Sequence, residues 1–484
     1  MSPRASAGGP DVLAVDPAER FDLSPYLFMQ FMEPLGSADA SVEAAWDFPG
    51  QRWREDFVRT TAELAPTLIR WGGIFSDYYR WREGVGPRQR RKAMLNLCWG
   101  GTYSNQVGTA EFVDLCRRVG AEPLIGVNFE SDGRRHYARP KSGGVRTAGP
   151  AEAAAWVDYC NNPANALRRR HGHREPFDVR LWQIGNETSY SKAGFDCATA
   201  ARRTAAFARA MHRADPTIDL IGWGDDGWAG PMLDAAGEHL KYLALHVHFD
   251  STLPDSPLTG TEYRRSPANT WRHLMSASAK LEDKIAAMRR EVGGSGVGLA
   301  LTEGHFYLYP HNQCDVLRSW AAGVAYGRLH NVHARNGDLV KIATLADFCG
   351  NRWTVNAVMI RSPGNASYLM PVGRVMSLFR RHIGRKAVDV TGAPAGLDVT
   401  ASRSRKKVYL HVVNTRRTRP VRARLSVAGR KIARAEAFEI ADDPTREIDD
   451  TCGDLFAPRR RAMPATGRWT FPAASVTAVE LTLR

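Results

Sequence analysis

Short apolar runs alternate with amphipathic stretches along the chain from about residue 20 to residue 385. The runs at 179–184 and 242–248 have the length and apolar character of buried strands, whereas stretch 199–214 places apolar residues at helical spacing. The same pattern predicts strands at 66–71, 122–128, 218–222 and 298–302 and helices at 110–119, 151–159 and 276–290. Regular alternation of strand and helix over this length predicts an α/β fold, a (β/α)8 TIM barrel with insertions.

The pattern changes after residue 385. Short alternating segments at 397–402, 407–414, 421–427, 435–440 and 476–483 are separated by turn residues, and no helical pattern lies between them. We therefore predict a C-terminal antiparallel β-sandwich over residues 386–484, following a catalytic barrel over residues 20–385. The N-terminal segment 1–19 contains a run at 11–15 that could supply the sandwich with an extra strand.

Charge narrows the range of partners. The 66 Lys and Arg residues exceed the 51 Asp and Glu residues, which gives a formal net charge of +15. The basic runs at 88–92, 168–170, 403–407 and 459–461 are scattered and carry no interleaved aromatic residues. This favours a solvated surface over nucleic-acid binding, while an anionic substrate remains open.

Cysteines and apolar segments indicate the compartment. The seven cysteines are widely spaced and form no CxxC pair, so neither a disulfide framework nor a thiolate zinc site is expected. The N-terminus has no apolar signal region, and no apolar run reaches 18 residues, which predicts a cytoplasmic protein without a membrane span. We expect no cofactor.

Three predicted strands end in polar side chains, and TIM barrels carry their active sites at that end. Glu187 follows the strand at 179–184, Glu303 follows the strand at 298–302, and His246 and His248 end the strand at 242–248. Two carboxylates on separate strands can cleave a glycosidic bond, because one protonates the leaving oxygen while the other attacks the anomeric carbon. Carboxyl groups about 5 to 5.5 Å apart give retention of configuration.

His246 and His248 could instead be a metal-binding pair, because residues i and i+2 of a strand face the same side. Glu303 or Asp347 would then have to supply a third ligand. We adopt the interpretation of a substrate pocket and expect no metal. The long loops at 132–150 and 251–270 are expected to wall this pocket.

Nearly the full chain resembles family 51 of the glycoside hydrolases, the α-L-arabinofuranosidases. The most specific match is residues 182–187, Trp-Gln-Ile-Gly-Asn-Glu, and further matching segments lie at 24–36, 69–73, 81–87, 120–128 and 335–341. The resemblance implies a barrel followed by a β-sandwich, with Glu187 as acid/base and Glu303 as nucleophile. It also implies that Asn186 bonds the sugar 2-hydroxyl and that Glu33 and His246 line the glycone pocket. Members of the family are commonly oligomers, so a homo-oligomer is a further expectation.

Departures from the family pattern cluster around the sugar pocket. Ile74 stands in place of a sugar-binding asparagine, His248 replaces a tyrosine, and Asp347 aligns with a late glutamine. The nucleophile, usually within Asp-Glu-Trp, lies here in Thr302-Glu303-Gly304. Trp99 begins a stretch that differs from the family's Trp…Glu-Thr-Asn segment. The predicted substrate-binding residues are therefore Glu33, Ile74, Trp99, Asn186, His246, His248 and Asp347.

These observations predict a carbohydrate-active enzyme, an exo-acting retaining α-L-arabinofuranosidase. The altered pocket leaves a second hypothesis open, a retaining glycosidase of the same clan that acts on a hexofuranoside or a pyranoside. The altered pocket and the positive charge leave a third, a non-catalytic relative that binds carbohydrate or polyanion.

Overall fold

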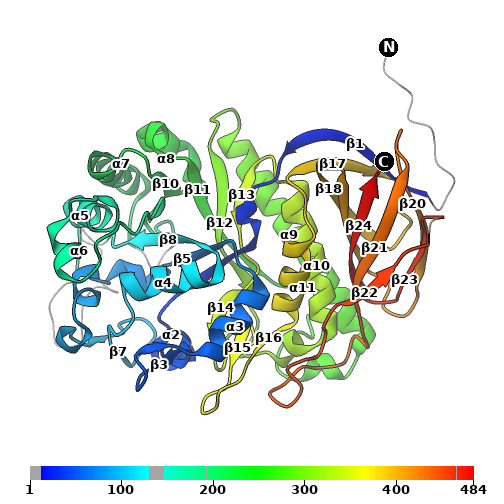
Figure 1. The fold of residues 1–484 in the computed structure, drawn as a ribbon, viewed down its shortest axis with the longest axis horizontal. Helices are drawn as coiled ribbons and strands as arrows, with labels where there is room; N and C mark the ends of the chain where they lie inside the picture. The colour runs from blue at the N-terminus through cyan, green and yellow to red at the C-terminus, as the bar shows by residue number, and fades with distance from the viewer. Residues whose placement is uncertain (1–11, 130–145, 191–193, 465) are drawn as a thin grey trace.

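The computed structural model describes residues 12–129, 146–190, 194–464 and 466–484. Figure 1 shows two bodies side by side, a barrel of strands surrounded by helices and a curled β-sheet that carries the C-terminus. Strand β1 (Val12–Asp22) belongs to the second body, and the chain then enters the barrel through the 3-10 helix η1 (Pro25–Phe28). Both ends of the described chain therefore lie in the C-terminal sheet.

Within the described residues, eight parallel strands form the barrel in the hydrogen-bonded order β13-β12-β11-β10-β9-β8-β5-β2. The barrel closes where η1, immediately before β2, lies against β13. The strands are β2 (Met29–Met32), β5 (Leu68–Trp71), β8 (Glu122–Val127), β9 (Leu181–Ile184), β10 (Asp219–Trp223), β11 (Tyr242–Phe249), β12 (Gly298–Phe306) and β13 (Val340–Ala343). Successive strands pair in sequence order, which confirms the predicted TIM barrel.

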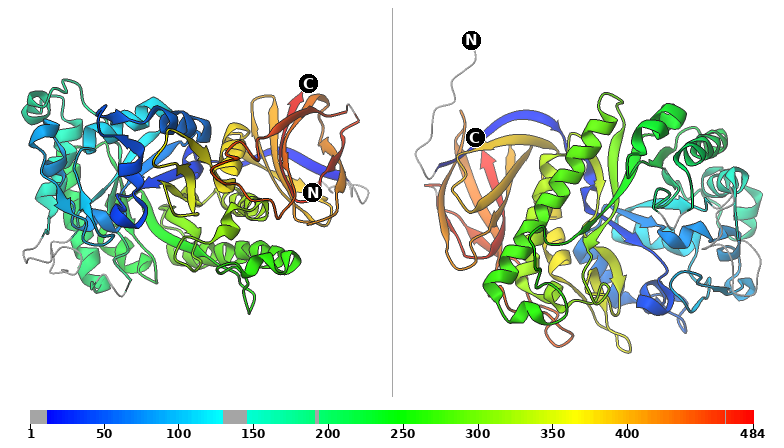
Figure 2. Two further views of the ribbon diagram at one scale, coloured as in Figure 1. Left: turned by 90° about the horizontal axis from the view of Figure 1, so that it is seen from below. Right: turned by 180° about the vertical axis from the view of Figure 1, so that it is seen from behind.

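Helices connect the strands and cover the outside of the barrel, as Figures 1 and 2 show. The main helices are α3 (Glu55–Leu64), α4 (Thr109–Val119), α5 (Pro150–Asn161), α7 (Cys197–Ala214), α8 (Ala229–Ala236), α9 (Pro267–Val292), α10 (Trp320–Arg335) and α11 (Pro371–Arg381). The Asp196 side chain accepts the Thr199 amide at 2.8 Å and thereby caps the start of α7. No helix in the described residues is both long and apolar enough to cross a membrane.

Shorter elements lie in the connections between the strands and the main helices. They are α1 (Gly36–Asp39), α2 (Ser41–Ala45), β3 (Trp46–Asp47), β4 (Arg52–Trp53), η2 (Ile74–Asp77), η3 (Trp81–Gly84), η4 (Arg88–Arg90), β6 (Met94–Leu95), β7 (Thr102–Tyr103), α6 (Ala166–Arg170), η5 (Gly237–His239), η6 (Glu262–Arg264), η7 (Asp315–Arg318), β14 (Asp347–Gly350), β15 (Asn356–Ile360) and β16 (Ser367–Leu369). Most of the predicted loop 132–150 lies outside the described residues. In the predicted loop 251–270, η6 and the first turn of α9 are helical.

The C-terminal body is a nine-stranded sheet within the described residues, ordered β22-β21-β24-β19-β18-β17-β1-β20-β23. Its strands are β17 (Lys386–Thr391), β18 (Leu397–Ser404), β19 (Lys407–Asn414), β20 (Val421–Val427), β21 (Ile432–Ala441), β22 (Arg459–Ala462), β23 (Arg468–Phe471) and β24 (Ser475–Leu483), together with β1. The sheet is mixed where an all-antiparallel one was expected, because β1 joins from the other end of the chain and runs parallel to β20. Figure 2 shows the sheet curled on itself, around a core that includes Leu13, Val408 and Leu481.

Buried contacts join the sheet to the barrel. The Phe379 ring, near the end of α11, stacks on the His411 ring of β19 with the centroids 3.8 Å apart. The Trp320 indole at the start of α10 donates to the carbonyl of Ala474 at 2.6 Å. The Arg335 guanidinium of α10 lies 2.7 Å from the Asp398 carboxylate of β18. Because apolar, hydrogen-bonded and ionic contacts all cross this boundary, the sheet packs against the barrel on the side of α10 and α11.

Candidate active site

The side chains that point into the barrel become polar toward the C-terminal ends of the strands. The interior core contains Leu68, Leu181, Ala244 and Ala300, one from each of four strands. Side chains alternate between the faces of a strand, so residues two positions further along point inward as well. These residues are Arg70, Gln183, His246 and Thr302. The barrel thus places a polar layer directly above its apolar core, at the end where TIM barrels bind substrates.

Arg70 is fully buried in this layer and connects three side chains from two other strands. Its Nε donates to Gln183 Oε1 at 2.7 Å, its Nη1 to Glu303 Oε1 at 2.9 Å and its Nη2 to Asn186 Oδ1 at 2.6 Å. Because arginine only donates hydrogen bonds, the Asn186 atom that faces it must be the oxygen. The Nδ2 of Asn186 is buried and has no hydrogen-bond partner among the described residues. That amide remains able to donate to a ligand.

Glu187 lies where the chain leaves β9, and its backbone is strained. Gly185 has a φ of 82° and Glu187 a φ of 53°, both in the left-handed region. A residue with a Cβ pays about 1 kcal/mol or more for this conformation, and such strain clusters at functional sites. The carboxylate is 18% exposed, and its Oε1 lies 3.0 Å from His246 Nδ1. The strained turn therefore directs this carboxylate toward the centre of the polar layer.

A β-bulge in β12 positions the second carboxylate. Strands β11 and β12 pair in register up to Leu245 and Leu301, after which His246 pairs with Glu303. Thr302 is the additional residue, so both it and Glu303 turn toward His246. The Thr302 hydroxyl lies 3.0 Å from His246 Nε2, and Glu303 Oε2 lies 3.5 Å from His246 Nδ1. Bulges beside active sites commonly re-aim side chains in this way.

Glu187, His246 and Glu303 form one compact cluster. One oxygen from each carboxylate and one ring nitrogen of His246 lie within 4.8 Å of one another. Three such groups could hold a metal ion. However, His246 Nδ1 already lies against Glu187 and its Nε2 against Thr302. Burial lowers the pKa of His246 to about 4, although the charge of Glu303 opposes this, so the ring is neutral near pH 7.

Glu33, which follows β2, forms a second part of the site. Its Oε1 accepts hydrogen bonds from the Phe75 amide at 2.7 Å and from the Trp99 indole at 2.9 Å. Burial raises the pKa of Glu33 well above its ordinary value, and the charge of Glu303 adds to the effect. Gly73 has a φ of 99°, and a Cβ there would lie 2.4 Å from the Glu33 carboxyl, so this approach requires glycine. Ile74 follows directly and packs, partly buried, against the barrel core.

Histidines and a carboxylate form a third part, above Glu303 on β11, β12 and β14. His305 Nδ1 lies 2.8 Å from Asp347 Oδ1, and the His248 and His305 rings are 4.7 Å apart. Burial alone would lower the pKa of His305, but Asp347, Glu303 and Glu187 together raise it above its ordinary value. Burial and the neighbouring His305 lower the pKa of His248 well below its ordinary value. The Nε2 of His305 has no hydrogen-bond partner in the described chain.

A layer behind His246 fixes the orientation of its ring. The Trp223 ring meets the imidazole edge-on with the centroids 4.7 Å apart, and the indole donates to Ser189 Oγ at 2.9 Å. Buried Asp225 accepts the backbone amide of His246 at 3.4 Å and the Tyr190 hydroxyl at 3.1 Å, and it also pairs with Lys284. These contacts leave His246 little rotational freedom.

The structure brings most of the predicted site residues together, although their roles in binding stay predictions. Glu187, Glu303, Asn186 and His246 share one network, and Trp99 joins Glu33. His248 and Asp347 both contact His305. Ile74 flanks Glu33 without a polar contact of its own side chain.

The sequence prediction did not single out four residues of the polar layer. They are Arg70, Gln183, Thr302 and His305. Arg70 could have been found as the one charged residue inside an otherwise apolar strand, since a buried charge needs a partner. His305 could have been found as the inward-facing position two residues after Glu303.

Comparisons with known proteins find related sequences and related structures. The model of the alpha-L-arabinofuranosidase 1 domain matches residues 60–252, a region that includes Arg70, Glu187 and His246. The intracellular exo-alpha-(1->5)-L-arabinofuranosidase of Halalkalibacterium halodurans is 32% identical over 244 residues, which cover 46% of this chain and 45% of that protein. The intracellular exo-alpha-(1->5)-L-arabinofuranosidase 1 of Bacillus subtilis is 26% identical over 380 residues, which cover 72% and 70%. The chain thus spans about half the length of the first of these relatives.

Solved structures share the fold over the whole chain. The GH51 alpha-L-arabinofuranosidase of Thermotoga petrophila RKU-1 has a TM-score of 0.80 at 22% identity and covers 97% of this chain and 99% of its own. The alpha-L-arabinofuranosidase of Thermotoga maritima, solved as an arabinose complex, has a TM-score of 0.76 at 24% identity, with coverage of 98% and 100%. The family model, the sequence relatives and the solved structures thus all relate this chain to the GH51 alpha-L-arabinofuranosidase family.

Proposed function

We propose that this chain is an exo-acting, retaining α-L-arabinofuranosidase in which Glu187 is the acid/base and Glu303 the nucleophile. The observation that carries the proposal is the close approach of the two carboxylates, whose nearest oxygens lie within 4.8 Å. Inverting glycosidases separate their carboxyl groups by about 6.5 to 9.5 Å to admit a water molecule, whereas retaining enzymes need about 5 to 5.5 Å. The choice of arabinofuranose as the sugar rests on the relatives, which are named as arabinofuranosidases.

In the first step, Glu303 Oε2 attacks the anomeric carbon while the bond from that carbon to the leaving oxygen breaks. Glu187 gives its proton to the leaving oxygen, so the aglycone departs as an alcohol and Glu187 becomes a carboxylate. The Arg70 guanidinium holds Glu303 Oε1 at 2.9 Å, which keeps the other oxygen in a fixed direction for attack. The product is a glycosyl ester of Glu303 with inverted configuration.

In the second step, a water molecule takes the place of the aglycone. Glu187 accepts one proton from this water as its oxygen attacks the anomeric carbon, and the ester bond to Glu303 breaks. The sugar leaves with its original configuration, Glu303 returns to a carboxylate, and Glu187 is protonated again. His246 lies within 3.5 Å of both carboxylates. Because its ring is neutral, it can orient them without adding a charge.

The surrounding groups are suited to a sugar ring. Asn186 Nδ2 is a buried donor beside the nucleophile and can bond a hydroxyl next to the anomeric carbon. Glu33 uses one carboxyl oxygen for Phe75 and Trp99, so its other oxygen can bond a second hydroxyl. Contacts of this kind position the anomeric carbon, and positioning accounts for a large part of enzymatic rate enhancement.

Kinetics on a panel of aryl glycosides, α-L-arabinofuranosides included, would test the proposal. We expect Glu303→Ala to lower kcat by about 10⁴-fold or more, because the variant lacks the carboxylate that forms the ester. Glu187→Ala should lower kcat/KM strongly for poor leaving groups and much less for dinitrophenolate, which needs no proton. Its kcat should fall for both kinds of substrate, because the second step also needs Glu187 as a base. Glu291→Ala, an exposed glutamate of α9, is the matched control and should behave as wild type.

Mass spectrometry after reaction with a mechanism-based arabinofuranoside inactivator should locate the covalent sugar on Glu303. The proposal fails if wild type hydrolyses no glycoside of the panel, if Glu303→Ala remains active, or if the adduct forms on another residue. Absence of turnover together with tight binding of the same sugars would instead support a non-catalytic binding protein.

A second candidate, a retaining glycosidase for a hexofuranoside or a pyranoside, is favoured by the third part of the site. His248, His305 and Asp347 form a polar cluster above Glu303, and the His305 Nε2 has no partner in the described chain. A glycone with one more hydroxymethyl group could reach that nitrogen. Comparing kcat/KM for matched aryl pentofuranosides and hexofuranosides decides between the candidates, since a polar site rejects substrates that leave its groups unpaired.

A further inference from the structure

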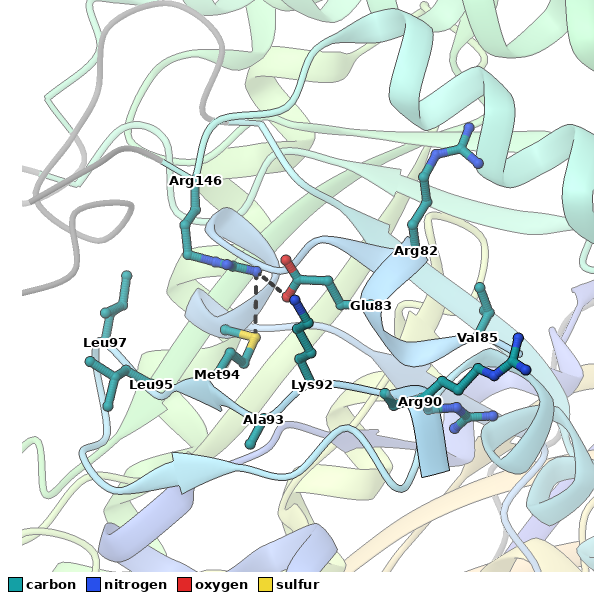
Figure 3. Close-up of a pocket in the computed structure, with 11 residues that line it drawn as sticks. Arg82, Glu83, Val85, Arg90, Lys92, Ala93, Met94, Leu95, Leu97 and Arg146 are labelled. Carbon is teal, nitrogen blue, oxygen red and sulfur yellow. Dashed lines mark hydrogen bonds and ion pairs between the residues drawn. The ribbon is translucent and has the colours of Figure 1, made fainter. Parts of the chain in front are cut away.

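A cationic pocket lies on the loops that follow β5, outside the cluster of Glu187 and Glu303. Its volume is about 540 Å³, within the range of about 300 to 1,000 Å³ typical of small-molecule sites. Among the described residues, its lining has one carboxylate, Glu83, and five cations, Arg82, Arg90, Arg91, Lys92 and Arg146. Figure 3 shows Leu95 and Leu97 at one end of this pocket and Arg82 and Arg90 at the other.

Three of these cations have no ionic partner among the described residues. Arg146 lies 2.6 Å from Glu83, and Arg91 lies 2.9 Å from Glu111, which also pairs with Arg88. The side chains of Arg82, Arg90 and Lys92 make no ion pair with any carboxylate of the described chain. All three are exposed, and the Arg82 guanidinium rests over the Trp81 ring at 4.4 Å. The pocket thus gathers more positive charge than its own carboxylates balance, which favours an anionic ligand.

Direct contacts connect this pocket to the candidate active site. The backbone carbonyl of Tyr78 accepts from Arg146 Nε at 2.9 Å, while the Tyr78 hydroxyl donates to Asn96 Oδ1 at 2.7 Å. The same Asn96 oxygen accepts the backbone amide of Trp99 at 2.9 Å, and the Trp99 indole bonds Glu33. One wall, built from Tyr78 and residues 94–99, therefore separates the pocket from Glu33.

We propose that the cationic pocket binds the carboxylate of a uronic acid residue in the aglycone, so that the preferred substrates are acidic glycans. This inference rests on the proposed function and deepens it by naming a substrate class. Guanidinium groups match carboxylates with two parallel hydrogen bonds, and neither Arg82 nor Arg90 pairs with a carboxylate of the described residues. Leu95 is 47% exposed and, with Leu97, offers an apolar surface for the C–H face of a sugar ring.

A matched pair of substrates tests the proposal. The first is an oligosaccharide in which the sugar bearing the arabinofuranosyl group neighbours a uronic acid, and the second is the same oligosaccharide after reduction of its carboxyl to an alcohol. We expect wild type to favour the acidic substrate by roughly tenfold in kcat/KM at low ionic strength, and to lose this preference as salt is added.

Two double variants locate the effect. Arg90→Gln with Lys92→Gln removes two cations of the pocket and should lower the acidic-to-neutral ratio toward one. Arg430→Gln with Lys431→Gln removes the same two residue types from an exposed turn of the C-terminal sheet and should leave the ratio at its wild-type value. A wild-type ratio near one, or an equal change in both double variants, would overturn the proposal.

A binding measurement separates this inference from the proposed function. Calorimetry on Glu303→Gln with the acidic oligosaccharide and its reduced form reports affinity without turnover. If wild type hydrolyses neither substrate, the proposed function fails. In that case, tighter binding of the acidic form, lost when Arg90 and Lys92 are replaced, would still support the pocket. Equal affinity for the two forms would refute the pocket even in an active enzyme.

Discussion

Replacement of Arg70 by methionine is the most direct test of how the site is held together. Methionine has a similar reach but no charge, so the barrel would keep its packing while Glu303 loses its ionic partner. At 2.9 Å and an effective dielectric constant near 20, the lost attraction between Arg70 and Glu303 is about 6 kcal/mol before desolvation is counted. Removing one partner from a buried ion pair costs about 3 to 5 kcal/mol of stability in practice. We expect the free energy of unfolding to fall by that amount.

Activity should fall as well, because Arg70 holds Glu303 and Asn186 at once. A displacement of about 1 Å in a catalytic group can cost roughly 100-fold in rate, so kcat/KM for an aryl arabinofuranoside should drop by about 10² to 10³. Arg70→Lys keeps the charge but can replace only part of the three hydrogen bonds, so it should lie between wild type and Arg70→Met.

The control is Arg54→Met. Arg54 lies 2.9 Å from Asp56, and these side chains are only 11% and 7% exposed. Arg54 comes directly before α3 and Asp56 lies in its first turn, so this ion pair is on the outside of the barrel. This variant should lose stability while kcat stays within about twofold of wild type. Urea unfolding at pH 7 and steady-state kinetics on the same preparations provide both measurements. The reasoning is refuted if Arg70→Met is as active as Arg54→Met, or if it unfolds at the wild-type urea concentration.

Three further predictions concern titratable groups. Glu33 has a raised pKa, so its ionisation destabilises the folded state as pH rises. Glu33→Gln should therefore raise the melting temperature more at pH 8 than at pH 5, and a pH-independent change would contradict this. His246 has a pKa lowered to about 4, so protonation of this residue lowers the free energy of unfolding by on the order of 3 kcal/mol as pH falls from 6.5 to 4. In urea unfolding over that range, His246→Asn should lose less stability than wild type. Asp347→Asn removes the nearest carboxylate from His305 and should lower the pKa of that imidazole, which NMR of ¹⁵N-labelled histidine would report; an unchanged titration would count against the pairing.

The barrel and the proximity of Glu187 and Glu303 were predictable because they follow from periodicity and position. Apolar runs separated by helical stretches give parallel strands, and the carboxyl ends of parallel strands meet at one face. Glu187 and Glu303 follow or end such runs, so their proximity needs no knowledge of the side-chain packing. The extra strand at residues 11–15 was suggested for the same reason, as an apolar alternating run, and it extends to Asp22 in the structure.

The register of the strands could not be predicted, and the register controls the detailed geometry. The bulge at Thr302 depends on how β12 pairs with β11, which is a contact between residues more than 50 positions apart. Without the bulge, Glu303 would point away from the barrel interior, because side chains alternate along a strand. The bond from Trp99 to Glu33 likewise joins positions separated by 66 residues. Contacts of this kind depend on loop conformations, which no local pattern encodes.

The departures from the family pattern also appear differently once their neighbours are known. In the sequence His248 and Asp347 are separate substitutions, but in the structure both contact His305. Asp347 is 3% exposed, and a buried carboxylate without a cation nearby is costly. His305 lies 2.8 Å from Asp347, which raises the pKa of the imidazole and so favours its charged form. Asp347 and His305 therefore stabilise one another in this position. His248, His305 and Asp347 therefore form one cluster rather than three independent positions. Reversion of Asp347 alone would leave the buried His305 without the group that stabilises its charge, and the glycone preference of the site therefore has to be attributed to the cluster as a whole.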